Sequence, residues 1–162
     1  MKRIAYTLLF IIGIAMLLPS CTGALVYDQY EHTPIAGWEK NDTLSFEVPP
    51  LASGGTYQGS LGLRITGAYP FMKLTLIVTS KVYPKNGPKG KYEVSEDTLQ
   101  CDLIDQFGKT KGQGISYYQY NMPISVKDLQ EGDSLLFAIR HDMKREILPG
   151  ISDIGLKLTR IR

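Results

Sequence analysis

The sequence predicts an all-β protein, a single-domain antiparallel β-sandwich that is jelly-roll-like. Apolar and polar residues alternate with a period of two along nearly every ordered stretch, as in strands with one buried face. Turns rich in Pro, Gly and Asn, such as "YPKNGPKGK" and "FGKTKGQG", separate these stretches. Seven or eight short strands at this spacing are typical of two packed antiparallel sheets.

In chain order, strands are expected at residues 43–48, 60–66, 73–80, 98–105, 134–142 and 153–161, and residues 24–33 precede them as an edge strand. Each of the six places apolar side chains on one face, which two facing sheets would bury. The expected core positions are Leu44, Phe46, Val48, Leu61, Leu63, Ile65, Leu74, Leu76, Val78, Leu99, Cys101, Leu103, Leu135, Phe137, Ile139, Ile154, Leu156 and Leu158. Only residues 126–132 could form a helical turn.

The N-terminus indicates a lipoprotein. Lys2 and Arg3 precede an apolar run over residues 4–18, too short to span a membrane and long enough for a signal peptide. Leu18 and Ser20 before Cys21 match a bacterial lipobox, so residues 1–20 are expected to be removed and Cys21 to carry diacylglycerol and acyl chains. The alternative is an ordinary signal peptide cleaved elsewhere, with Cys21 left as a thiol.

This N-terminus sets the domain organisation. Residues 1–20 are the expected lipoprotein signal peptide, 21–30 the lipid-anchored tether and edge strand, and 26–162 the sandwich domain. A lipidated Cys21 cannot pair with Cys101, which is then expected to be a small buried hydrophobe. The protein would be tethered to a membrane by its lipid without spanning it.

The composition of the chain limits the classes of partner to be expected. Without residues 1–20, about 142 residues remain, enough to bury a core in one domain without disulfides. Lys2 and Arg3 account for the net charge of +2, so the rest of the chain is formally neutral. This balance argues against nucleic acid as a partner.

The residues that could support catalysis are few. His32 and His141 share no local motif, and no metal-ligand spacing or phosphate-binding glycine loop occurs. His141 is in phase with a strand's apolar face and is expected to be structural. Asp142 and Asp153 could meet as a carboxylate pair, but we expect both to be solvated turn residues. We therefore expect neither an enzyme nor a metal or other cofactor beyond the lipid.

Three features suggest binding. Tyr117, Tyr118 and Tyr120 would stack on sugars or anchor a protein partner if exposed, and would otherwise pack on the core and cover an edge. Trp38, the only tryptophan, is a further binding candidate, although a lone Trp before a strand usually plugs one end of a sandwich. The basic loop at residues 81–91 would suit phosphates or an acidic partner, or simply keep a sheet edge unpaired.

Three stretches together resemble the gliding-motility lipoprotein GldH family of Bacteroidetes. After the lipid cysteine, that family has a spaced aromatic pair, a Trp and a "D-x-x-x-F" strand. The matching residues here are Tyr27, Tyr30, Trp38, Asp42 and Phe46. The C-terminal "IRHDMKREILPGISDIGLKL" resembles the family's ending, through Met143, Lys144, Leu148, Gly150, Ile151, Asp153, Ile154 and Gly155. The middle segment "SEDTLQCDLID" to "GKTKGQG" is also similar.

The resemblance implies a non-enzymatic accessory or scaffold component of an envelope assembly linked to gliding motility and type IX secretion. Its partners would be the membrane, through the lipid, and other envelope proteins. No acidic cluster follows Cys21, so an outer-membrane position facing the periplasm is expected. The alternative is a glycan- or peptidoglycan-binding module that uses the tyrosines; a hydrolase is a more distant possibility. From the residues alone, Gly150 and Gly155 suit a turn and a bulge or close backbone approach.

Overall fold

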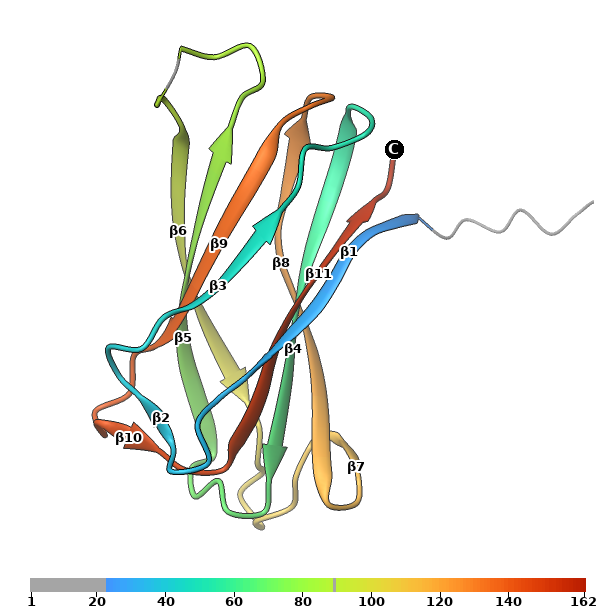
Figure 1. Cartoon of the computed structure of the whole chain (residues 1–162). Helices are drawn as coiled ribbons and strands as arrows, with labels where there is room; N and C mark the ends of the chain where they lie inside the picture. Colours follow the sequence, from blue (N-terminus) through green and yellow to red (C-terminus); the bar gives the residue numbers. More distant parts are fainter. Residues whose placement is uncertain (1–22, 89) are drawn as a thin grey trace, which may run out of the picture.

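The computed structural model describes residues 23–88 and 90–162, which are folded into strands and turns (Figure 1). The expected signal peptide and Cys21 lie outside the described residues. The strands are β1 (Ala24–His32), β2 (Trp38–Glu39), β3 (Leu44–Val48), β4 (Gly55–Thr66), β5 (Lys73–Tyr83), β6 (Glu93–Asp102), β7 (Gln113–Gly114), β8 (Tyr117–Leu129), β9 (Ser134–His141), β10 (Ile147–Leu148) and β11 (Ile151–Arg160).

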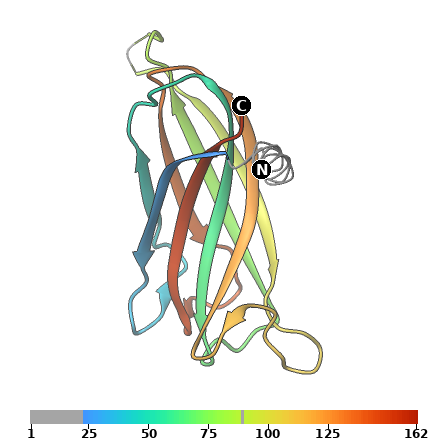
Figure 2. The same ribbon diagram turned by 90° about the vertical axis from the view of Figure 1, so that its right-hand side faces the viewer.

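Two antiparallel sheets pack face to face. One has the strand order β1-β11-β4-β8-β7 and the other β3-β9-β5-β6, while β10 and β2 form a small separate pair (Figures 1 and 2). After β3 the chain crosses between the sheets repeatedly, so that β11 returns between β1 and β4. This order of the eight long strands is that of a jelly roll, and the predicted fold class is confirmed.

The core lies between the two sheets, where alternate side chains of facing strands meet. The expected core positions are buried in it, except Leu44 and Leu99, which are partly buried and pack against it. The expected helical turn at residues 126–132 is wrong, because β8 continues as a strand to Leu129 and is paired with β4. Pairing with a neighbouring strand outweighs the weak local preference for helix there.

The sandwich has two distinct ends. At one end, residue 23 lies beside the C-terminus, since Ala24 pairs with Arg160. The β5–β6 hairpin extends past this same end (Figures 1 and 2). From there β1 runs toward the opposite end, which we call the distal end. The distal end comprises the loops at residues 33–37, 67–72, 103–116 and 142–150 (Figure 1). Nine residues of β1 cover about 30 Å at the usual rise of a strand.

Candidate functional site

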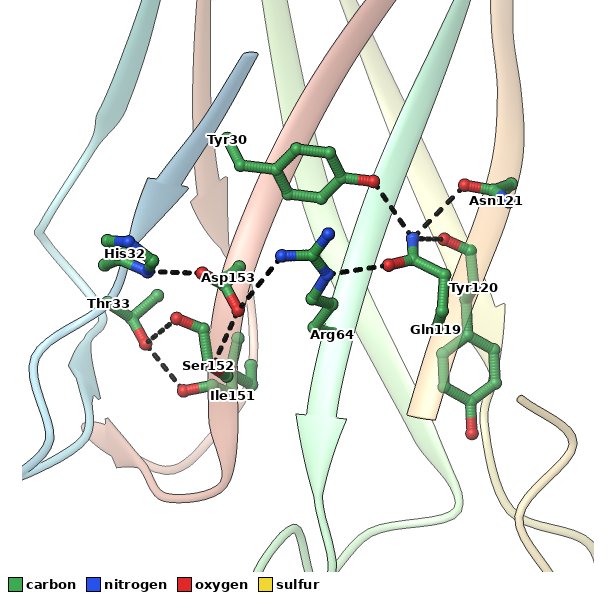
Figure 3. Close-up of polar contacts among 10 residues, drawn as sticks. All are labelled: Tyr30, His32, Thr33, Arg64, Gln119, Tyr120, Asn121, Ile151, Ser152 and Asp153. Carbon is green, nitrogen blue, oxygen red and sulfur yellow. Dashed lines mark hydrogen bonds and ion pairs between the residues drawn. The ribbon is translucent and has the colours of Figure 1, made fainter. Parts of the chain in front are cut away.

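A row of four polar residues crosses the outer face of the first sheet close to the distal end. Strand pairing sets His32 of β1 opposite Asp153 of β11, Asp153 opposite Arg64 of β4, and Arg64 opposite Gln119 of β8. The four side chains are linked in this order (Figure 3). We call these four residues the polar row.

Asp153 is the buried member of the polar row, with only 3% of its surface exposed. Its Oδ1 faces Nδ1 of His32, and its Oδ2 accepts a hydrogen bond of 2.6 Å from Oγ of Ser152. Nη1 of Arg64 lies 4.0 Å from the same Oδ2. A buried carboxylate needs such partners, because its desolvation would otherwise be costly. The polar row therefore holds the start of β11 to the end of β1.

Next to the polar row, Tyr30 covers a pair of glycines. Gly155 of β11 and Gly62 of β4 are opposite each other, and a Cβ atom at either position would collide with the Tyr30 ring. The guanidinium carbon of Arg64 is 4.2 Å from the ring centroid, a cation–π distance. Nε2 of Gln119 donates a hydrogen bond of 3.1 Å to the Tyr30 hydroxyl. The ring is thus fixed by contacts with three other strands.

The same corner fixes two distal loops. Oγ1 of Thr33 donates a hydrogen bond of 2.6 Å to the Ile151 carbonyl, and the Thr33 N–H donates to the Ser152 carbonyl at 3.0 Å. The Gly150 carbonyl accepts a hydrogen bond of 2.8 Å from Thr66 N–H, and Gly150 has a φ of 79°, which favours glycine. The loop after β1 and the turn before β11 are therefore held in one arrangement.

Large apolar side chains gather on the distal loops. Ile35 is fully exposed, Ile115 is 91% exposed and Phe107 is 85% exposed. A cavity of about 530 Å³ lies between Ile35, Tyr117, Ala68 and Pro149. A second cavity, of about 310 Å³, borders Met72 and Phe107. We call the exposed large apolar residues at the distal end the end surface; they are Ile35, Met72, Phe107, Ile115, Tyr117 and Ile147.

The expected tyrosine platform is not assembled as a unit. Tyr117 is 58% exposed and belongs to the end surface, whereas Tyr118 and Tyr120 point inward and pack against the core. The Tyr120 hydroxyl donates a hydrogen bond of 2.7 Å to the Leu103 carbonyl. Because neighbouring residues of a strand face opposite sides, three tyrosines at these positions cannot share one exposed face. Tyr118 and Tyr120 instead match the alternative, in which the tyrosines pack on the core and cover an edge.

The binding role considered for Trp38 requires a correction, because its side chain is fully buried. Its Nε1 donates a hydrogen bond of 3.0 Å to the Asp42 carbonyl, and its ring meets His141 edge to face at 5.3 Å. His141 contacts the Trp38 carbonyl through Nε2 at 3.1 Å. Burial lowers the pKa of His141 below its ordinary value of 6.5, which keeps the imidazole neutral. Both rings close the distal part of the core.

Asp153 also differs from its expected place in a solvated turn. It lies in β11 and is buried under the polar row, whereas Asp142 is exposed. The row was missed because its members come from four strands far apart in the sequence. One available signal was Gly155 inside a strand, where a bulge or a close backbone approach was expected; the group that approaches in the structure is instead the side chain of Tyr30.

Cys101 occupies the position expected for a small buried hydrophobe. It is buried and free of disulfide bonds, and desolvation raises the pKa of its thiol to about 12. Across residues 23–88 and 90–162, no cluster of three or more His, Cys, Asp or Glu side chains is placed to hold a metal ion. Nor does that part of the chain contain a helix long and apolar enough to cross a membrane.

Comparisons with solved structures give only weak similarities. A family 115 4-O-methyl-α-glucuronidase is 14% identical, with a TM-score of 0.45 over 85% of this chain and 18% of that one. A CocE/NonD family hydrolase from Staphylococcus aureus is 11% identical, with a TM-score of 0.39 over 85% of this chain and 31% of that one. The chain thus spans less than a third of either enzyme. Neither similarity supports an inference about function.

Comparisons of sequence are more informative. The gliding motility lipoprotein GldH of Flavobacterium johnsoniae is 28% identical over 151 residues, covering 89% of this chain and 90% of the relative. A GldH homolog of Christiangramia forsetii is 26% identical over 170 residues and covers 96% of both chains. The sequence profile of the GldH lipoprotein matches residues 25–158, which include all four residues of the polar row. The chain therefore belongs to the GldH lipoprotein family.

Proposed function

We propose that this protein is a non-enzymatic accessory or scaffold component of an envelope assembly associated with gliding motility and type IX secretion, and that it binds other envelope proteins through its distal end. As a GldH-family lipoprotein it is held to the cell envelope by lipid. The observation that carries the proposal is the end surface, where large apolar side chains are exposed on neighbouring loops.

The position of the end surface favours a protein partner over the anchoring membrane. The chain enters the fold beside Arg160, and the distal end lies about 30 Å farther along β1. A lipid on the N-terminus would therefore hold the end beside Arg160 near the bilayer and leave the distal end farther from it. The polar row and the Thr33 hydrogen bonds keep two of the distal loops, the one after β1 and the one before β11, in one arrangement, which lowers the entropy cost of binding there.

The proposed location is the outer membrane, facing the periplasm. The support is the sequence after the anchor, "CTGALVYDQY", which lacks an acidic cluster and has Thr22 in place of an aspartate. Trypsin added to intact cells tests this location. We expect the protein to survive until the outer membrane is permeabilised; digestion in intact cells would show that it faces the outside.

Crosslinking in living cells tests the partner. A C-terminally tagged protein is crosslinked mildly, purified and analysed by mass spectrometry. We expect gliding or type IX secretion lipoproteins with the wild type and fewer of them with a Phe107→Ser, Ile115→Ser double variant. Val94→Ser is the control, because Val94 is an exposed apolar residue on β6, outside the end surface. Recovery of the protein alone, or equal recovery with both variants, would contradict the proposal.

A further inference from the structure

A polar groove lies on the outer face of the first sheet, between the polar row and the C-terminus. It has a volume of about 410 Å³ and crosses β1, β11, β4 and β8. It is separate from the end surface and from the tyrosine run. The lining residues that matter here are Asp28, Tyr30, Gln58, Ser60, Asn121 and Lys157.

Small residues create the groove. Strand pairing aligns Tyr30, Gly155, Gly62 and Asn121 in one row across the sheet. The Tyr30 ring lies over the two glycines, and the next outward position on β4 is the small residue Ser60. The sheet face is therefore low beside the ring, at Ser60, with the longer side chain of Lys157 opposite it on β11.

One wall of the groove is rigid. The Tyr30 ring lies over the glycine pair with the Arg64 guanidinium 4.2 Å from its centroid, and its hydroxyl accepts a hydrogen bond from Gln119. Nε2 of Gln119 also donates to Oδ1 of Asn121 at 3.2 Å, which orients the amide on the opposite wall (Figure 3). A ligand would thus meet walls that are already ordered, so binding would order few side chains.

The lining groups define the ligand's chemistry. Asp28 and Lys157 face each other across β1 and β11, so their charges balance and the groove favours neither anions nor cations. Gln58 and Asn121 supply amides that both donate and accept, and Ser60 supplies a hydroxyl. Such a set matches a neutral ligand with many hydroxyl groups, since each hydroxyl needs both a donor and an acceptor.

We infer that this groove binds a neutral saccharide through hydrogen bonds from Gln58, Ser60 and Asn121. Two sources in a bacterial envelope offer this chemistry: the glycan strands of peptidoglycan, and the sugars of surface polysaccharide. A tetramer of N-acetylglucosamine represents the first source, and a tetramer of mannose the second.

Titration of the full-length lipoprotein with each tetramer, in a detergent whose headgroup is not a sugar, tests the inference. Saturation-transfer NMR reports binding down to millimolar affinity. We expect saturable binding of one tetramer, weakened about tenfold by Gln58→Ala or Asn121→Ala through the loss of one or two hydrogen bonds. Ser60→Tyr, which fills the groove, abolishes it.

The control is Gln100→Ala, which removes an exposed amide from β6 in the other sheet and leaves binding unchanged. The tetramer that binds identifies the source. The inference is overturned if neither tetramer binds at millimolar concentration, or if the groove variants, still folded by circular dichroism, bind as the wild type does. Because the crosslinking experiment depends on the end surface, the two proposals can fail separately.

Discussion

The ring of Tyr30 occupies the space that a side chain at position 155 would need. A Cβ atom placed on Gly155 would lie 2.5 Å from Cε1 of the ring. This contact joins the edge strand β1 to the interior of its sheet. It also explains in physical terms why glycine suits that strand position.

A methyl group at position 155 is therefore expected to destabilise the protein. Gly155→Ala should lower the free energy of unfolding by about 1–3 kcal/mol, because the ring must move away from its partners. Chemical denaturation measures this. Gly67→Ala is the control, with open space around the position and an expected change within about 0.5 kcal/mol.

A double-mutant cycle separates this contact from a general intolerance of the strand. With Tyr30→Ala already present, Gly155→Ala should cost much less than in the wild type. An equal cost in both backgrounds would show that the ring is not the obstacle.

Removing the buried carboxylate should also weaken the fold. Asp153→Ala leaves Arg64 and His32 without their shared partner and is expected to cost about 1–3 kcal/mol. Asp142→Ala, at an exposed position, should change the stability by less than about 0.5 kcal/mol. Thermal and denaturant unfolding compare the two. Equal effects would mean that the polar row contributes nothing beyond an ordinary surface aspartate.

Burial of His141 predicts a pH dependence. Its pKa is lowered in the folded state, mainly by desolvation, so the unfolded chain takes up the proton first as the pH falls below 6.5. Stability should therefore be unaffected by this group above that pH and should decline below it. His141→Gln, measured over the same range, should lose that part of the decline. An unchanged slope in the variant would show that His141 does not contribute.

The buried thiol should be unreactive. The pKa of Cys101 is raised to about 12 and its side chain is buried, so little thiolate is available. In a Cys21→Ser variant, a thiol reagent at mildly alkaline pH should label Cys101 only after unfolding. Fast labelling of the folded protein would place Cys101 at the surface.

The sequence predicts the inner faces of the strands better than the outer ones. Leu61, Leu63 and Ile65 are identified as core because burial requires alternation along a single strand, and that is a local pattern. The contact of His32 with Asp153 depends on which strands become neighbours. The jelly-roll winding decides this by bringing β11 back beside β1.

The end surface shows the same limit. Ile35, Phe107 and Ile115 lie in segments expected only to be turns, and nothing local indicates that they share one end of the sandwich. Tyr117 was singled out with its neighbours, but strand alternation separates it from Tyr118. The family resemblance, in contrast, depends on motifs readable along the chain, and the comparisons bear it out.

We propose that the protein binds its partner at the distal end, opposite the end that its lipid would hold near the membrane. Photo-crosslinking in cells tests it most directly, with a light-activated amino acid placed at Ile115 in one strain and at Val94 in another. We expect protein adducts from position 115 and few or none from position 94. Adducts from position 94 with none from 115 would contradict it.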